Sequence, residues 1–205
     1  MIERLKSRLG ELWRQPSAVG GLELWFDTVL LVLRIFSLAY WLRYPFERRN
    51  ETARRNCLVD GYCVVEFIVL VTLLVGPLYP FVSSFLCWYF LFEIYLSLFN
   101  IVFLGKFAGI NYKPPSIERD ILLMFLNVLQ VVVAFAVLYR TWLGLPKIEA
   151  LSAAVNVLGT VGLPPVIGNL ALLVDLQILL DVILLVIFLA SFAGQVRVFQ
   201  RDETQ

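Results

Sequence analysis

Residues 57–104 form the longest apolar stretch of the chain, and its length limits the fold more than any other feature. As a single helix at about 1.5 Å per residue, the stretch would be more than twice as long as the roughly 30 Å hydrocarbon core of a bilayer. Gly76, Pro77 and Pro80 interrupt it, and glycine and proline end or kink helices. The stretch therefore predicts a hairpin of two membrane-spanning helices, with a single span followed by a re-entrant piece as the alternative.

Composition predicts that lipid is the solvent for most of the chain. Hydrophobic residues make up 60% and charged residues 16% of its 205 residues, more apolar surface than one soluble core of this size can bury. We therefore expect an all-α integral membrane protein, a multi-pass bundle of four to five membrane-spanning helices in contact with membrane lipids. The expected location is the cell membrane, plasma or inner. No removable signal peptide is expected at the basic N-terminus.

Residue content argues against several classes of function. The chain has no histidine, which removes His-ligated zinc or haem and any Ser-His or Cys-His nucleophile, so neither an enzyme nor a cofactor is expected. A formal net charge of +1 gives no electrostatic footprint for nucleic acid. Cys57, Cys63 and Cys87 lack the spacing of metal ligands and are expected to be packing residues. An intramembrane enzyme that uses Asp and Glu side chains on lipid is the remaining catalytic alternative.

The first 115 residues divide into two parts. Residues 1–20 carry apolar side chains at helical spacing among basic ones, the pattern of an amphipathic helix on an anionic membrane surface, with a solvated helix or tail as the alternative. Residues 21–115 hold the N-terminal transmembrane helices. The apolar segment near their start contains Arg34, and an arginine at bilayer depth needs a partner. We expect that partner to be Glu66 or Glu93, because a lone arginine does not make the repeated basic pattern of a voltage sensor.

Basic residues beside the apolar segments predict the orientation of the chain. The positive-inside rule places in the cytoplasm the ends that carry Lys106, Lys113, Arg119, Arg197 and Arg201. The basic stretch at 43–55 lies on the same side if residues 57–104 form a hairpin. A spanning first segment would then leave the basic N-terminus outside. The alternative is that one of the first two apolar segments lies in the membrane without crossing it.

Residues 116–196 are expected to fold as a long helix, a short helix and a second long helix. Ser116 precedes acidic residues in a helix start, and that helix should run to about Leu143. Its polar Asn127 and Gln130 are expected to hydrogen-bond to neighbouring helices. Pro146 is placed to open the short helix. The second long helix is expected at residues 170–196.

The tripeptide Thr160-Val161-Gly162 lies between the short helix and the second long helix. This order resembles the pore module of tetrameric potassium channels, in which an outer helix, a re-entrant pore helix, a TVGYG filter and an inner helix follow one another. The resemblance covers residues 116–196 and implies a helical bundle with a re-entrant pore module, assembled as a homotetramer that conducts K+ or Na+. Residues 197–205 are then a short cytoplasmic tail, and gating falls to the membrane helices, the N-terminal segment, lipids or an unidentified partner.

The resemblance assigns the ion filter to Thr160, Val161, Gly162 and Leu163, whose backbone carbonyls would replace the water shell of the ion. Leu163 stands where the family has tyrosine, and Pro164 stands where it has a second glycine. Proline cannot adopt the positive φ that is used there. We therefore expect weak selectivity for potassium. A membrane scaffold or accessory subunit that has kept the fold without conducting is the alternative function.

Four residues of the inner helix recur at the spacing of one helical face: Gln177, Asp181, Leu184 and Phe188. In a tetramer this face is expected to line the cavity and gate, with Asp181 forming a ring of carboxylates that attracts cations. A buried, hydrogen-bonded carboxylate between subunits is the alternative for Asp181, and packing against the neighbouring helix is the alternative to a gate for Phe188. Asp175 lies on another side of the helix and is expected to anchor it behind the filter.

Overall fold

The computed structural model of the chain describes residues 28–30, 32–42, 52–76, 79–99, 117–159 and 169–202. These residues contain no strand. Their principal helices are α4 (Thr52–Val75), α5 (Pro80–Phe99), α6 (Ile117–Leu143), α7 (Lys147–Leu158) and α8 (Asn169–Asp202). Every one of them except α7 is long and apolar enough to cross a membrane, which gives 4 candidate spans in the described part of the chain. The expectation of an all-α, multi-pass membrane protein is confirmed.

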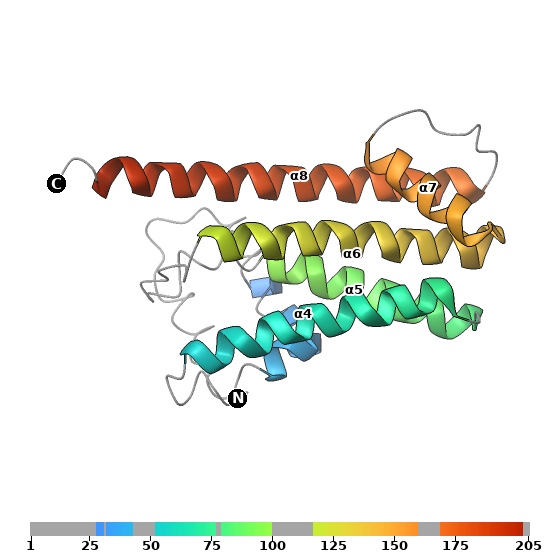
Figure 1. The fold of residues 1–205 in the computed structure, drawn as a ribbon, viewed down its shortest axis with the longest axis horizontal. Helices are drawn as coiled ribbons and strands as arrows, with labels where there is room; N and C mark the ends of the chain where they lie inside the picture. Colours follow the sequence, from blue (N-terminus) through green and yellow to red (C-terminus); the bar gives the residue numbers. More distant parts are fainter. Residues whose placement is uncertain are drawn as a thin grey trace.

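The stretch at residues 57–104 does contain a hairpin of two helices, as predicted. Helices α4 and α5 run in opposite directions along the bundle (Figure 1). Helix α4 ends where the Gly76 amide donates to the Thr72 carbonyl at 2.8 Å. Helix α5 begins at Pro80, whose fixed φ and missing N–H suit the first position of a helix. Local sequence signals are therefore sufficient to place this turn.

Helix α6 is the central element of the bundle. It packs against α4, α5 and α7, and in Figure 1 it lies between α8 and the α4–α5 pair. Every residue from 130 to 139 is buried, so α6 is covered on all sides over almost three turns. A helix that is apolar all round is suited to such a position. Its bounds agree with the helix expected from Ser116 to Leu143.

A tight turn after α6 sets the direction of α7. Gly144 follows the last residue of α6 with φ of 65°, a left-handed conformation that glycine adopts without strain. Pro146 then precedes α7 and accepts a hydrogen bond from the Ala150 amide at 2.9 Å. Ala150 and Ala154 are fully buried, and small residues at these positions let α7 approach its neighbours closely. The predicted opening of the short helix at Pro146 is confirmed.

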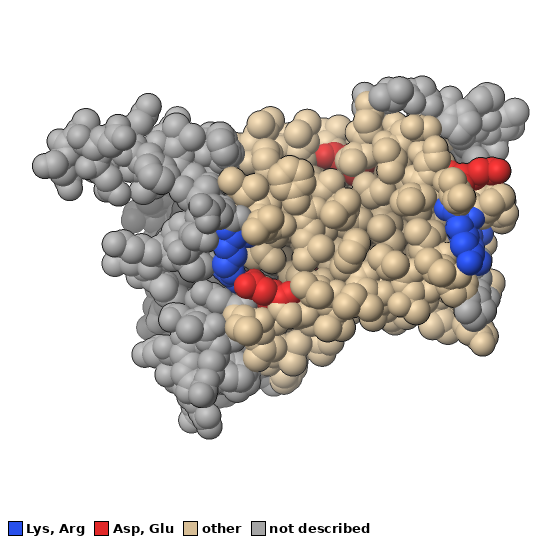
Figure 2. All heavy atoms as spheres, viewed as in Figure 1, with Lys and Arg blue, Asp and Glu red and all other residues tan. Residues whose placement is uncertain are grey.

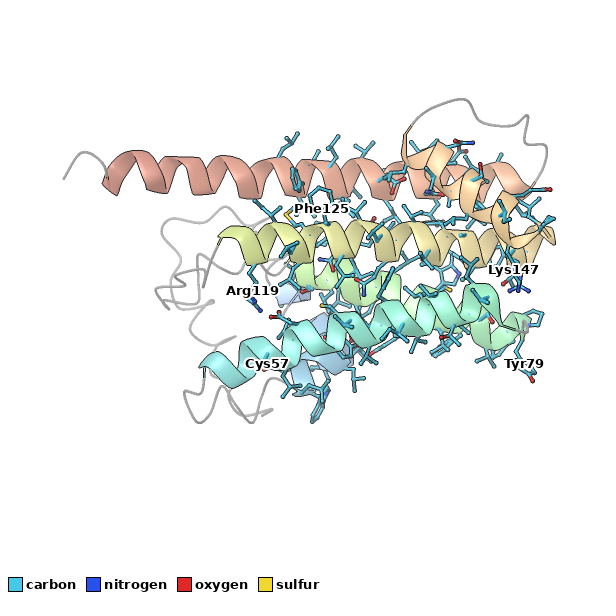
Figure 3. All side chains as sticks on the ribbon, viewed as in Figure 1. Cys57, Tyr79, Arg119, Phe125 and Lys147 are labelled. Carbon is cyan, nitrogen blue, oxygen red and sulfur yellow. The ribbon has the colours of Figure 1, made fainter. Side chains whose placement is uncertain are left out.

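Charged side chains of the described residues gather at the two ends of the bundle. The first residues of α4 and α6 and the last residues of α5 and α8 lie at the same end of the bundle. Arg119 and Cys57 lie near this end, and Lys147 and Tyr79 lie at the opposite end (Figure 3). Figure 2 shows the described charged side chains mostly near these two ends, with a wide uncharged face between them. The orientation stays a prediction: in the sequence, most basic residues are close to the helix termini that lie at the first end, and the positive-inside rule predicts that such an end is cytoplasmic.

The first apolar segment is broken in its described part. A 3-10 turn occupies Arg34–Phe36, Ser37 is non-helical, and helical backbone resumes at residues 38–42. The segment packs on the second half of α5, where Leu30 and Leu96 are buried together. A break at this point favours the alternative in which the segment lies in the membrane without crossing it. The predicted amphipathic helix at residues 1–20 lies outside the described residues.

Substitution of Gly144 by alanine should lower the free energy of unfolding by about 1 kcal/mol, because a Cβ is strained at positive φ. The space around Gly144 is open, so backbone strain rather than collision causes the loss. Gly61→Ala is the matched control, since Gly61 lies inside α4 with equally open surroundings and alanine favours helix there. Unfolding of the purified protein in mixed micelles measures both variants, and an equal effect of the two would contradict the role of Gly144.

Candidate functional site

A buried polar junction joins α6, α7 and α8 inside the bundle. The Gln177 side chain is fully buried at its centre. Its Oε1 accepts a hydrogen bond from the Tyr139 hydroxyl at 2.6 Å, and its Nε2 donates to the Ala154 carbonyl at 2.9 Å. The same Nε2 lies 3.3 Å from Oδ2 of Asp181. One side chain therefore holds three helices together with satisfied hydrogen bonds.

Helical spacing on α8 explains why this junction forms. Its buried positions include Leu173, Gln177, Asp181 and Leu184, which recur every three or four residues and face α6 and α7. Gln177 lies about 12 Å along α8 from Asn169, at roughly 1.5 Å per residue. Because Ala154 of α7 lies beside it, α7 is packed against α8 well inside the length of the spanning segment Ala171–Leu189.

Three of the four residues predicted to line a shared cavity are buried within their own chain. Gln177 is 0%, Leu184 7% and Asp181 8% exposed, while Phe188 is partly exposed. The periodicity correctly identifies one face of the helix, but Tyr139 and Ala154 are what Gln177 contacts. The cavity role of this face stays a prediction, and the burial of these side chains counts against it.

A different face of α8 is exposed in the single chain. Its side chains recur at helical spacing along the span: Leu172, Asp175, Leu179, Val182, Val186 and Leu189. We call this set the open stripe of α8. It is apolar except for Asp175, which lies about 9 Å from the start of the helix. An ionised carboxylate facing lipid at that depth is costly, so the open stripe is suited to a watery or protein neighbour near its outer end.

The predicted filter lies outside the described residues. Thr160, Val161, Gly162 and Leu163 directly follow Gly159, which caps α7. The Gly159 amide donates to the Val155 carbonyl at 2.9 Å and closes the last turn of α7. The assignment of the filter therefore remains a prediction, attached to a helix end that the structure does describe.

A second buried cluster surrounds Glu93 of α5. The Glu93 carboxylate accepts hydrogen bonds from the Ser37 hydroxyl at 3.0 Å, from the Tyr89 hydroxyl at 2.7 Å and from the Leu38 amide. The Ser37 Oγ in turn accepts a bond from the Tyr40 amide at 3.2 Å. A carboxylate at the start of the helical residues 38–42 satisfies amides that the break in the segment leaves open, and the helix dipole favours its charge.

The predicted partners of Arg34 occupy different helices. Glu93 lies against the broken segment that contains Arg34, and Glu66 is buried in α4 at 4% exposure. The Arg34 side chain lies outside the described residues, so the ion pair stays a prediction. The contacts of Glu93 with Ser37 and Tyr89 were not anticipated, because sequence gave no sign that the segment breaks at Ser37.

Further polar contacts join α4 to α6 and to the start of α7. The predicted hydrogen bond of Gln130 to a neighbouring helix is confirmed, with Nε2 donating to the Cys63 carbonyl at 2.8 Å. The Arg140 guanidinium donates to the carbonyls of Leu74 at 2.6 Å and Gly76 at 2.9 Å, and Lys147 donates to the Val75 carbonyl. Two cations thereby satisfy the C-terminal end of α4, where the helix dipole is negative.

The described residues contain no group of three or more His, Cys, Asp or Glu side chains that could hold a metal ion. Comparison with protein-family models, with curated proteins and with solved structures found no match. The function must therefore be argued from the helices and their buried polar groups.

Gln177→Leu should lower the free energy of unfolding by about 1–2 kcal/mol, because the Tyr139 hydroxyl is then buried without its acceptor. Tyr139→Phe alone should cost less, since it removes the hydroxyl instead of stranding it. The double variant should be more stable than the sum of the two losses predicts, by at least about 0.5 kcal/mol. Unfolding in mixed micelles measures all three variants, and strictly additive losses would show that the bond contributes nothing.

Glu93→Leu should loosen the start of the helical residues 38–42, because three donors lose one shared acceptor. Hydrogen exchange of these amides in nanodiscs, followed by mass spectrometry, should rise roughly tenfold, as expected from a local loss of about 1.4 kcal/mol. Glu93→Gln keeps an acceptor oxygen and should give a smaller rise. Unchanged exchange in Glu93→Leu would mean that the carboxylate does not hold the segment.

Proposed function

We propose that this chain is one subunit of a tetrameric channel that conducts monovalent cations across a cell membrane. The observation that carries the proposal is the placement of α7. This short helix follows a spanning helix, lies beside α8 within the length of its span, and has Ala154 bonded to Gln177 there. A short helix that ends inside the bilayer region is tolerated where the backbone beyond it lines a cavity.

The end of α7 is suited to a cation. Its last carbonyls carry the negative end of the helix dipole, and Thr160 and Val161 follow directly after the capping Gly159. Carbonyls of Thr160, Val161 and Gly162 would replace the water shell of the ion, with the Thr160 hydroxyl beside them. Leu163 and Pro164 then change the outer filter, which is why we propose weak discrimination between K+ and Na+.

One chain contributes too few elements to enclose an ion, so four copies about a common axis are required by this proposal. The open stripe of α8 is the face that we assign to the axis. Its apolar residues would form the wall of the cavity, and Asp175 from each copy would form a ring of carboxylates near the outer end. Such a ring raises the local concentration of cations and repels anions.

Gln177 positions α7 in this proposal and does not touch the ion. Its bonds to Tyr139 and Ala154 fix α7 against α6 and α8, and hence fix the point at which the filter begins. The junction gives each subunit a rigid frame around a filter that lacks the bracing tyrosine of the family it resembles. Gating by lipids or by another protein is compatible with this arrangement.

Reversal potentials of purified protein in planar bilayers test the proposal. With K+ and Na+ on opposite sides, currents should be cation-selective with only weak preference between the two ions. Asp175→Asn should reduce the preference for cations over anions several-fold, because the proposed ring loses its charge. No current from protein reconstituted as an intact tetramer would contradict conduction and favour the scaffold.

Asp181→Asn is the matched comparison, since it makes the same change about 1.7 turns further along α8. If Asp181→Asn alters ion preference and Asp175→Asn does not, the buried face lines the pore and our assignment of the open stripe is wrong. If both variants keep the wild-type preference, neither face supplies the charge that the ion meets.

A further inference from the structure

Two buried polar atoms, one on α5 and one on α8, lack hydrogen-bond partners among the described residues. The Tyr95 hydroxyl, in a side chain that is 7% exposed, has no hydrogen-bond partner among the described protein atoms. The same holds for Oδ1 of Asp181, in a side chain that is 8% exposed. The Tyr95 hydroxyl can donate a hydrogen bond, and Oδ1 of Asp181 can accept one. An unsatisfied polar atom in an apolar interior costs several kcal/mol, so both require a partner.

The two groups belong to the same part of the bundle. Helix α5 contacts α8, and Tyr95 and Leu184 lie in one continuous core cluster. Helices α5 and α8 run in the same direction in Figure 1; at roughly 1.5 Å per residue, Tyr95 lies about 22 Å from the start of α5 and Asp181 about 18 Å from the start of α8, so the two residues lie at similar depths in the bundle. Tyr139 is satisfied by Gln177, whereas Tyr95 is not. Two unsatisfied atoms, one a donor and one an acceptor, therefore lie on helices that contact each other.

We infer that Tyr95 and Asp181 form a binding site for a single buried water molecule. Water can accept the Tyr95 hydrogen bond through its oxygen and donate to Oδ1 of Asp181, which balances donors and acceptors at both groups. Buried waters in proteins typically bridge two to four polar groups that would otherwise be unsatisfied. A metal ion fits less well, because the described residues offer no group of three or more ligating side chains.

The water completes a chain of polar contacts across the bundle. From α6 the chain runs through the Tyr139 hydroxyl to Gln177, then to Asp181 on α8, and then through the water to Tyr95 on α5. The bond from Gln177 to the Ala154 carbonyl adds α7 to the same network. Asp181 is then a hydrated carboxylate held inside the subunit. This inference does not rest on the proposed channel activity.

Water-edited solid-state NMR of labelled protein in liposomes tests the site, by measuring polarisation transfer from water protons to side-chain carbons. Transfer to Asp181 Cγ should be at least several-fold faster than transfer to the methyl groups of Leu173, which is buried on the same helix. In Tyr95→Phe the Asp181 transfer should fall at least twofold, because the water loses one of its two partners. Tyr89→Phe makes the same change on α5 at a hydroxyl that is bonded to Glu93, and should leave that transfer unchanged.

Two results would overturn the inference. Transfer to Asp181 as slow as that to Leu173 in the wild type would mean that Tyr95 and Asp181 satisfy each other directly in a dry core. Fast transfer that is unaffected by Tyr95→Phe would mean that Asp181 meets water from elsewhere, such as a pore. Neither result depends on ion conduction, so failure of this inference is distinguishable from failure of the proposed channel.

Discussion

The arrangement of the described helices depends most on the hydrogen bonds of the Gln177 side-chain amide. In lipid there is no water to satisfy a displaced backbone or side-chain group, so a short helix such as α7 needs fixed partners inside the protein. Gln177 supplies them by accepting from Tyr139 and donating to Ala154, and the small residues Ala150 and Ala154 allow the close approach that these bonds require. If this junction is lost, α7 has few other polar contacts in the described residues to keep it packed against α6 and α8.

Charged side chains at the two ends of the bundle add further contacts between helices. Arg119 of α6 forms a salt bridge with Asp60 of α4 at the end predicted to be cytoplasmic, with Nε donating to Oδ2 at 2.9 Å. At the opposite end, Arg140 and Lys147 hold the C-terminal carbonyls of α4. Three side chains of α6 therefore bond to α4 along its length: Arg119, Gln130 and Arg140. Helices α7 and α8 pack against α6, which is joined to α4 by these polar contacts.

Much of the fold could be predicted because its signals are local. Glycine and proline at residues 76–80 marked the hairpin, Pro146 marked the start of α7, and the sequence pattern of a serine followed by acidic residues marked the start of α6. Helix α8 ends at Asp202 instead of Val196, because hydropathy does not report helix that continues beyond the bilayer. Contacts of Glu93 and Gln177 could not be predicted. Periodicity tells which residues share a face of a helix, but not which neighbour that face meets, and Tyr139 lies far from Gln177 in sequence.

The account of function depends on four copies of α7 and α8 surrounding one axis. Electron cryomicroscopy of the protein in lipid nanodiscs measures this directly. The account predicts a particle with fourfold symmetry, in which the segment after Gly159 and the open stripe of α8 face the central axis and Gln177 remains inside each subunit. A particle without fourfold symmetry, or one in which the segment after Gly159 faces lipid, would contradict it.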